Sequence, residues 1–265
     1  MGNGLVPLFL VSVPVHTDGM QVAQGRSLSA HARLAYVTPS HQFPLGVSMS
    51  LEQRLALLHW AQEADAWIVE DDYDSEYRFG GRPVEALQGL DQANRVIYIG
   101  TFSKVLFPAI RLGYLVVPAA LMKLFTHAQR FQNIHPPILE QMALADFFTQ
   151  GHFVRHLRRT RVRYAARLQA LLTAIRSECD DLLELHVPAA GLHVSGWLPP
   201  GTADTEIEQC AARHGIEAMA FSTMSKQPMP RGGLMLGFAA CSEQEIQAGA
   251  RILARVLRES RRGVY

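Results

Sequence analysis

One stretch of the chain, residues 96–114, joins two apolar runs through a polar loop. The run at 96–99 is rich in β-branched and aromatic residues and breaks at Gly100. Hydroxyl side chains, Lys104 and Arg111 follow before a second apolar run begins at Tyr114. Short apolar runs of this composition are typical of buried strands. The stretch therefore predicts a strand, a reactive loop and a second strand.

Lys104 is the candidate reactive group of this loop. The chain has only three lysines, Lys104, Lys123 and Lys226, although lysine and arginine together number 25. A partly desolvated lysine can lose its proton and attack a carbonyl as a neutral amine, whereas arginine cannot. Taken alone, Lys104 also fits an ordinary loop lysine, so its chemistry depends on what lies beside it.

Composition limits the class of protein. With 265 residues, 48% apolar content and a net charge of +1, the chain is expected to be a soluble globular protein of one large or two modest domains. This charge does not require nucleic acid or a membrane surface as a partner. Three cysteines without a C-x-x-C pair suggest neither a disulfide framework nor a zinc site, so a cytoplasmic location is expected. We expect no signal peptide and no membrane anchor, because no apolar run reaches the spanning length.

The first half of the chain alternates predicted strands and helices. Residues 5–15 are expected to form a strand pair or one irregular strand before a turn at 17–19. Further strands are expected at 34–37, 67–69, 95–99 and 114–117, with a short helix at 84–90. Such alternation predicts an α/β fold with a mainly parallel sheet and a site along the carboxyl edge of that sheet.

A helix is predicted to begin at Ser50. The sequence Ser-Leu-Glu-Gln places a carboxamide three residues after a hydroxyl, as in a capping box. Apolar residues then follow at helical spacing, namely Leu51, Leu55, Leu58 and Ala61.

After Pro118 the pattern changes to long helices followed by an α+β unit. Helices are expected at 119–129, 138–150, 152–177, 204–214 and 242–258, and strands at 183–187, 191–198 and 233–238. This pattern predicts a partial large domain at 1–136 and a complete small domain at 137–265, bridged by the helix at 152–177. That helix carries six arginines by residue 167. A nucleic-acid surface is one interpretation, but a solvated face is preferred, because apolar residues supply a buried stripe at Leu157, Tyr164, Leu168, Leu171 and Leu172.

Two predicted strand ends together carry a distinctive set of groups. The first has Asp71, Asp72 and Tyr73, and the second has Lys104 and Arg111. Pyridoxal phosphate requires a lysine for its aldehyde, a carboxylate for its pyridine nitrogen, a phenol for its O3′, and hydroxyls with an arginine for its phosphate. Each group alone has a structural explanation, as a solvated acidic loop, a core tyrosine or an ion-pair partner, but the combination predicts a pyridoxal-phosphate site.

The same residues carry a resemblance to a known family. The sequence Thr101-Phe102-Ser103-Lys104 followed by Arg111 resembles the lysine signature S-x-S-K-x(6)-R of fold-type I aminotransferases. Residues 38–46 and 70–77 resemble more narrowly the aminotransferase-like domain of MocR-type regulators, a subgroup of the GntR transcription factors. The similarity runs from about Val13 to the C-terminal helix and includes Gly191-Leu192-His193.

The resemblance implies the PLP-dependent transferase fold type I and assigns roles to individual residues. Lys104 would be the Schiff-base lysine and Asp71 the partner of the pyridine nitrogen. Tyr73 would contact O3′, while the remaining residues, Thr101, Ser103 and Arg111, would face the phosphate. A homodimer and a small-molecule amino acid or amine as substrate or effector are also implied.

The chain departs from the family pattern at several points. Phe43 stands where most aminotransferases have an asparagine for O3′, leaving Gln42 or His41 as substitutes. Met235 stands where enzymes often have an arginine for the substrate carboxylate, and Arg231 is a weak replacement. The glycine-rich phosphate loop, the stacking aromatic and the winged helix of the resembling proteins are not found, so an N-terminally truncated fold-type I chain is expected.

The preferred interpretation is a pyridoxal-phosphate-binding domain that forms the effector-sensing or cofactor-sensing part of a transcriptional regulator, with little or no transamination. In that interpretation, contact with DNA belongs to a winged-helix domain absent from this chain. The alternatives are an active aminotransferase acting on an amino acid, a DNA-binding or interaction module that uses the arginine-rich helix, and a domain without cofactor.

Overall fold

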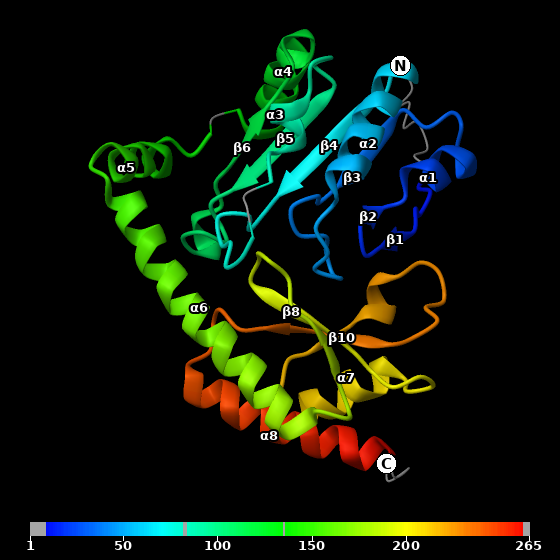
Figure 1. Cartoon of the computed structure of the whole chain (residues 1–265). Coiled ribbons are helices and arrows are strands. Elements are labelled where there is room, and N and C mark those ends of the chain that lie inside the picture. The colour runs from blue at the N-terminus through cyan, green and yellow to red at the C-terminus, as the bar shows by residue number, and fades with distance from the viewer. Residues whose placement is uncertain (1–8, 82–83, 135, 262–265) are drawn as a thin grey trace.

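The computed structural model of the chain describes residues 9–81, 84–134 and 136–261. Its main architecture is two four-stranded sheets, and Figure 1 shows the first sheet above the second. The long helix α6 (His152–Cys179) runs beside both. Within the described part of the chain, no helix is long and apolar enough to cross a membrane.

The first sheet is mainly parallel, as predicted. Its strands, in spatial order, are β3 (Leu34–Val37), β4 (Trp67–Asp72), β5 (Val96–Thr101) and β6 (Gly113–Val116). The first three run parallel, and β6 is antiparallel to β5. The reversal follows from the short loop at 102–112, since a parallel neighbour would need a longer crossover.

One face of this sheet carries a compact core. The helices on this side are α1 (Val22–Leu28), α2 (Leu51–Glu63) and α3 (Leu87–Leu90). Leu57, Trp60 and Ala61 of α2 pack with Ile68 and Val96 of the sheet. Burial of these side chains fixes α2 against the sheet and so positions the loop that leads into it.

Helix α2 begins where the sequence predicts. The Ser50 hydroxyl accepts a hydrogen bond from the Gln53 backbone N–H at 3.2 Å. The Gln53 side chain does not complete a capping box with Ser50. Instead it accepts from the Val22 N–H at 3.2 Å and donates to Asp18 at 3.0 Å. The cap therefore also ties α2 to the N-terminal segment.

The prediction of a buried apolar stripe on α2 is wrong at two positions. Leu51 and Leu55 are half exposed, whereas Arg54 is completely buried. The Arg54 guanidinium donates to the carbonyl oxygens of Pro39 at 2.8 Å, Met49 at 2.9 Å and Glu85 at 3.1 Å. These three acceptors let a charged side chain occupy an interior position, and they hold both ends of the loop at residues 38–49.

Two short strands precede α1. They are β1 (Val15–His16) and β2 (Gly19–Met20), paired antiparallel across a turn at 17–18. Of the expected strand at 5–15, residues 5–8 lie outside the described residues and 9–14 form no strand.

The segment after the first sheet is helical and largely exposed. It comprises η2 (Ala119–Leu121), α4 (Met122–Asn133) and α5 (Ile138–Thr149). Large apolar side chains such as Leu124, Phe131 and Leu139 lie at the surface. No residue of α5 is buried.

Helix α6 bridges the two sheets. Near its start the His156 ring lies 2.8 Å from the Val105 carbonyl oxygen, beside the lysine loop. Its second half, from Leu168 to Cys179, contributes to the core of the second sheet. Of the predicted apolar stripe, the part from Leu168 onward is buried, while Leu157 is only partly buried. The domain boundary at 136 stays a prediction.

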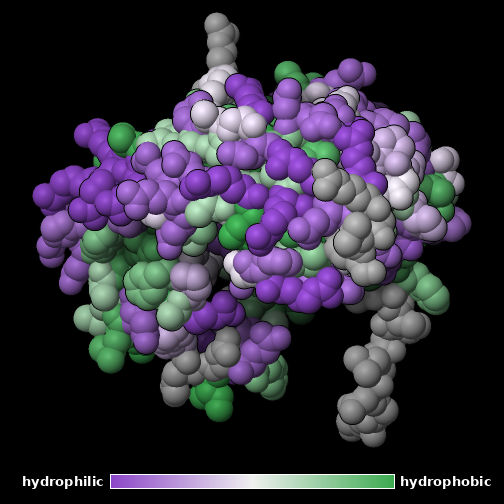
Figure 2. All heavy atoms as spheres, turned by 90° about the horizontal axis from the view of Figure 1, so that it is seen from below, coloured by the Kyte–Doolittle hydropathy of each residue, from purple (hydrophilic) through white to green (hydrophobic). Residues whose placement is uncertain are grey.

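The second sheet is antiparallel throughout and covered by helices. Its strands, in spatial order, are β7 (Glu184–His186), β8 (His193–Trp197), β10 (Gly233–Gly237) and β9 (Met219–Ala220). Two helices, α7 (Asp204–Arg213) and α8 (Glu243–Arg261), join α6 against it, and η3 (Phe221–Met224) follows β9. The sequence did not predict β9 or η3. Figure 2, seen from below, shows a mostly hydrophilic outer surface with scattered apolar patches.

Candidate functional site

The predicted site residues are placed at the carboxyl ends of β4 and β5. Asp71 pairs with Ile99 in the sheet, and Thr101 is the last residue of β5. The loop at residues 38–49 leaves the neighbouring strand β3 at the same edge, because β3 and β4 are parallel. Three segments, 38–49, 71–77 and 101–111, therefore begin at one edge of the sheet, where ligands of such sheets are commonly bound.

Asp71 is held by a tyrosine from the adjacent strand. Tyr36 of β3 donates its hydroxyl to Asp71 Oδ2. Partial desolvation of the hydroxyl at the sheet edge, followed by the hydrogen bond to Asp71, raises the pKa of Tyr36 although much of its ring is exposed. Tyr36 therefore remains a donor at neutral pH, and Asp71 Oδ2 accepts its hydrogen bond. A carboxylate fixed in this way can accept a hydrogen bond from a protonated ring nitrogen.

Tyr73 follows β4 and contacts the loop after β3. Its hydroxyl donates to the His41 carbonyl oxygen at 2.9 Å and lies 3.2 Å from His41 Nδ1. Burial, and then the charges of Asp74, Asp71 and Asp72, raise the pKa of Tyr73. Tyr73 is therefore available as a hydrogen-bond donor and not as a base.

Lys104 lies in a turn directly after β5. The turn is closed by the Leu106 N–H donating to the Phe102 carbonyl at 2.8 Å. Lys104 is exposed and has no hydrogen-bond or ion-pair partner among the described residues. Its charge nevertheless helps to lower the pKa of His193, after burial and His41, to about 3.

The remaining predicted residues flank the lysine. Thr101 Oγ1 accepts from the Ser103 N–H at 3.1 Å, which orders the start of the turn. Arg111 follows η1 (Pro108–Ile110) with φ of 50°, in the left-handed region, and is exposed. A non-glycine residue in this region costs about 1 kcal/mol and often marks a functional loop. Arg111 has no hydrogen-bond or ion-pair partner within the described ranges, so its guanidinium is available to a ligand.

Gly100 is required by the packing of this edge. A Cβ atom at this position would lie 2.2 Å from the Tyr114 ring. Tyr114 of β6 crosses over Gly100 and also contacts Phe102, with ring centroids 5.5 Å apart. The glycine therefore allows β6 to close over the end of β5 and to fix the residue two before Lys104.

The substitutes considered for the missing asparagine are already engaged. Gln42 donates to the Phe43 carbonyl at 2.5 Å and accepts from the Leu45 N–H at 3.1 Å. His41 is buried against Asp74. Arg231, the suggested replacement for a carboxylate-binding arginine, pairs with Glu184 at 2.6 Å in the second sheet.

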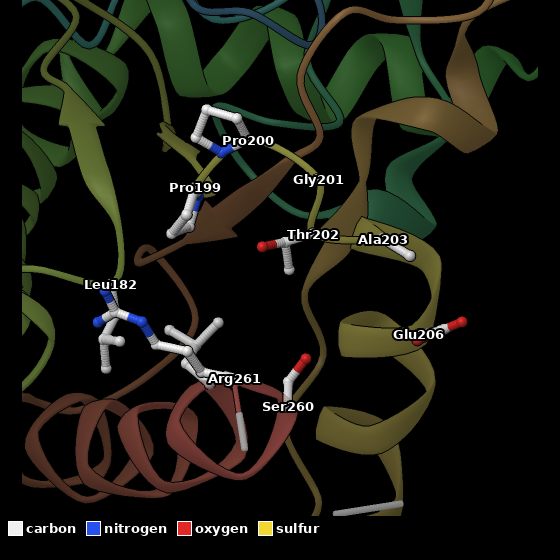
Figure 3. Close-up of a pocket in the computed structure, with 10 residues that line it drawn as sticks. Leu182, Pro199, Pro200, Gly201, Thr202, Ala203, Glu206, Ser260 and Arg261 are labelled. Carbon is white, nitrogen blue, oxygen red and sulfur yellow. The ribbon is translucent and has the colours of Figure 1, made fainter. Parts of the chain in front are cut away.

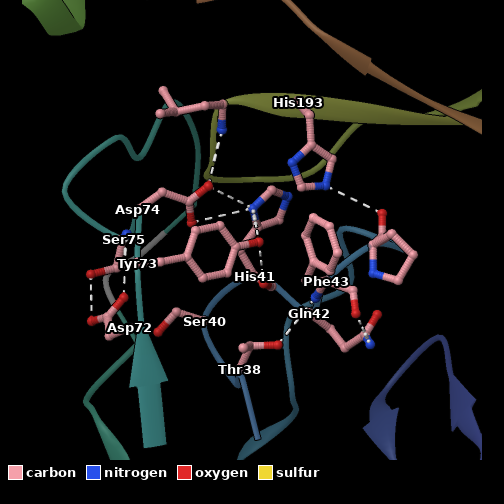
Figure 4. A network of polar contacts seen from close by, with 12 residues as sticks. Thr38, Ser40, His41, Gln42, Phe43, Asp72, Tyr73, Asp74, Ser75 and His193 are labelled. Atoms are coloured by element: carbon pink, nitrogen blue, oxygen red, sulfur yellow. Dashed lines mark hydrogen bonds and ion pairs between the residues drawn. The ribbon is translucent and has the colours of Figure 1, made fainter. Parts of the chain in front are cut away.

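A buried polar cluster at this edge was not predicted as a unit. Figure 4 shows it between the 38–49 loop and β8. His41 Nδ1 lies 3.0 Å from Asp74 Oδ2, which also accepts from the Leu192 N–H at 3.1 Å. The His193 ring faces His41, with centroids 4.3 Å apart, and its Nε2 lies 3.2 Å from the Pro44 carbonyl oxygen. Sequence reasoning named His41 and His193 separately, because contacts between distant segments leave no local signal.

A separate hollow lies at the far end of the second sheet. It has a volume of about 390 Å³ and is lined by residues 199–203 together with Leu182, Glu206 and Arg261 (Figure 3). None of the predicted site residues line it. Its charged side chains are those of Glu206 and Arg261, and Arg261 pairs with Asp181 at 2.8 Å. The hollow therefore has fewer unpaired reactive or charged side chains than the strand ends.

Comparison with known proteins places this geometry in a family. The model of the aminotransferase class I and II family matches residues 31–253. The chain is 42% identical to the probable rhizopine catabolism regulatory protein MocR of Rhizobium meliloti over 91% of this chain and 48% of that protein. It is 31% identical to 2-aminoadipate transaminase of Thermus thermophilus over 85% of this chain and 57% of that protein. The chain thus spans about half the length of the curated relatives it matches.

Solved structures agree with the predicted fold. Kynurenine aminotransferase of Pyrococcus horikoshii superposes with a TM-score of 0.86 at 26% identity, over 94% of this chain and 63% of that one. The α-aminoadipate aminotransferase LysN of Thermus thermophilus gives 0.86 at 29% identity, over 96% and 66%. That LysN structure holds N-(5'-phosphopyridoxyl)-L-leucine. The predicted fold type I and the resemblance to MocR-type regulators are confirmed, and the chain belongs to the class I and II aminotransferase family.

Proposed function

We propose that the chain binds pyridoxal phosphate at the carboxyl edge of its first sheet and serves as the cofactor-sensing or effector-sensing part of a transcriptional regulator. One observation carries the proposal. Lys104 is exposed, without a partner among the described residues, in a turn at the same sheet edge as Asp71. The similarity to MocR supports the regulatory part.

The donor set fits this cofactor. When bound, pyridoxal phosphate supplies an aldehyde that condenses with amines and a ring that withdraws electrons. Lys104 would hold the aldehyde carbon and move a proton, and Asp71 would keep the pyridine nitrogen protonated. Tyr73 would donate to O3′. The phosphate would be held by Thr101, Ser103 and Arg111, and Arg111 is free of other charge partners among the described residues.

A sensing function is preferred to a catalytic one because capture of a substrate carboxylate is incomplete in this chain. Arg231 is committed to Glu184, and Met235 offers no charge. The second candidate, an active aminotransferase, is favoured by the similarity to 2-aminoadipate transaminase. Spectral cycling of the loaded chain with amino and oxo acids would favour the enzyme, whereas binding without turnover would favour the sensor.

The partners follow from the same proposal. The ligand would be an amino acid or an amine, because such molecules compete with Lys104 for the aldehyde. The chain would act as a homodimer in the cytoplasm, and a clean monomer by light scattering would count against a finished site. Contact with DNA would belong to a winged-helix domain that is not within these 265 residues.

The test is a titration with pyridoxal phosphate followed by absorbance. A new visible band should saturate in the unaltered chain and be lost in Lys104→Ala. Lys123→Ala is the matched control, because Lys123 is also exposed and lies on α4 away from the strand ends. No band at millimolar cofactor, or an equal band in Lys104→Ala, would contradict the proposal.

A further inference from the structure

The oxygen of Tyr73 is located by a single residue. Both of its polar contacts belong to His41, the carbonyl oxygen at 2.9 Å and ring Nδ1 at 3.2 Å. Phe43, which lies edge-on to Tyr73 with centroids 6.4 Å apart, offers no polar atom. The place of the Tyr73 hydroxyl therefore depends on how firmly His41 is held.

His41 is held on every side. Asp74 lies against Nδ1, with its two oxygens at 3.0 and 3.3 Å. Two glycines with positive φ form a slot for the ring. A Cβ atom at Gly191 would lie 2.0 Å from the His41 ring, and one at Gly46 would lie 3.2 Å from Nε2. The imidazole therefore cannot rotate without displacing backbone.

The hydrogen bonds define one arrangement of the pair. Nε2 of His41 is buried without a partner in the described structure, so a proton there would have no acceptor. A proton on Nδ1 satisfies Asp74 and lies toward the Tyr73 oxygen. The Tyr73 proton then points to the His41 carbonyl. Asp74 also accepts from the N–H of Leu192, the residue before β8, at 3.1 Å.

The cluster contains the residue types of a metal site, but its geometry favours hydrogen bonding. His41, Asp74 and His193 bring possible ligand atoms within 4.8 Å of one another. However, His193 Nε2 is already used by Pro44 and His41 Nδ1 by Asp74. The two rings are tilted by 34° with centroids 4.3 Å apart, so they also contact each other directly (Figure 4).

We propose that His41 and Asp74 are positioning residues that fix the Tyr73 oxygen, so that its proton, which lies on the His41 carbonyl in this structure, turns to the cofactor O3′ when the cofactor is bound. The inference rests on the proposed function and deepens it. His41 and Asp74 touch neither substrate nor cofactor in this scheme and act through Tyr73. Other titratable groups around His41 are His193, His186 and, beyond His193, Lys104. These stay unchanged in every variant below.

The test compares two amides at position 41. His41→Asn places an N–H donor near the position of Nδ1, whereas His41→Gln places its amide near Nε2. The readout is the pH midpoint of the absorbance change of the lysine-bound cofactor. A hydrogen bond from Tyr73 would draw negative charge from O3′. The oxygen would then attract the proton of the lysine–cofactor linkage less strongly, so the hydrogen bond would lower this midpoint. Loss of positioning should therefore raise the midpoint by about 0.5 to 1 pH unit, the equivalent of one hydrogen bond.

We expect the upward shift in His41→Gln and Asp74→Ala and a midpoint close to that of the unaltered chain in His41→Asn. Tyr73→Phe sets the upper limit of the shift. A purely structural contribution would lower the melting temperature of the cofactor-free variants and leave the midpoint unmoved, and that result would overturn the inference. Equal shifts in the two amides would overturn it as well. If the unaltered chain gives no band, the proposed function itself fails, which is a distinguishable outcome.

Discussion

The two sheets of this chain differ in how completely they are covered. In the second sheet, four of the five residues of β8 are buried, and helices α6, α7 and α8 close a continuous core over it. In the first sheet, every residue of β6 is exposed, as are Leu34 and Tyr36 of β3. The second sheet is therefore covered by the chain's own helices, whereas part of the first sheet stays open to solvent or to a binding partner.

The second sheet contributes mainly to stability, whereas the first sheet carries the candidate site. The closed sheet buries its apolar side chains and supplies most of the core. The open sheet leaves Lys104 and Arg111 without partners among the described residues, and burial followed by the charge of Asp74 raises the pKa of Tyr73 at the same edge. The exposed apolar side chains of β6 and β3 are of a type that commonly marks contact surfaces. We therefore expect substitutions to act mainly on stability in the second sheet and mainly on binding in the first.

The largest expected effect is in the closed core. Leu234 of β10 is completely buried, so Leu234→Ala should lower the free energy of unfolding by about 2 to 5 kcal/mol. Leu115→Ala on β6 is the matched control, because Leu115 is 49% exposed, and it should change the value by less than about 0.5 kcal/mol. Chemical denaturation of the chain, at one fixed protein concentration, measures both. Equal losses would remove the distinction between the two sheets.

An intermediate effect is expected at Glu76, where the segment after β4 meets α6. Burial raises the pKa of Glu76 to about 7 from its usual 4.5. The folded state therefore binds a proton more tightly than the unfolded state, and this contribution to stability is lost as pH rises from about 4.5 to 7. Glu76→Gln cannot ionise. As pH rises from about 4.5 to 7, the free energy of unfolding of this variant should therefore increase by on the order of 1 kcal/mol relative to that of the unaltered chain. Denaturation at pH 5 and pH 8 tests this, and a constant difference would contradict it.

The smallest effect is expected where the loop at residues 38–49 meets β8. Ser195 of β8 donates to the Pro44 carbonyl at 3.0 Å, and His193 lies against the same oxygen. Ser195→Ala leaves the Pro44 carbonyl oxygen with one hydrogen-bond partner, so the free energy of unfolding should fall by about 0.5 to 1 kcal/mol. The paired variant Pro44→Ala keeps the backbone carbonyl and tests whether the ring matters separately. A loss above about 2 kcal/mol in Ser195→Ala would mean that the junction is more tightly coupled than these contacts indicate.

The sequence predicted elements that depend on local patterns. The strand and loop around Lys104, the Ser50 cap and the order of elements in the second sheet all follow from runs of neighbouring residues. The two-residue strand β9 was not predicted, since it is too short to show a period. Family resemblance, and not periodicity, assigned roles to Asp71 and Tyr73.

Contacts between distant segments were beyond local reasoning. Arg54 is buried because three loop carbonyls surround it, and nothing in the helical pattern of α2 indicates those acceptors. Likewise Asp74 and Leu192 are 118 residues apart in the chain. The positioning cluster at His41 therefore emerges only when both sheets are in place.

The most direct test of the central claim is to map where pyridoxal phosphate attaches. The chain is incubated with one equivalent of cofactor, reduced with borohydride and digested, and the modified peptide is identified by mass spectrometry. Attachment at Lys104, with little at Lys123 or Lys226, is the predicted result. Attachment distributed over the three lysines, or none at Lys104, would contradict the account.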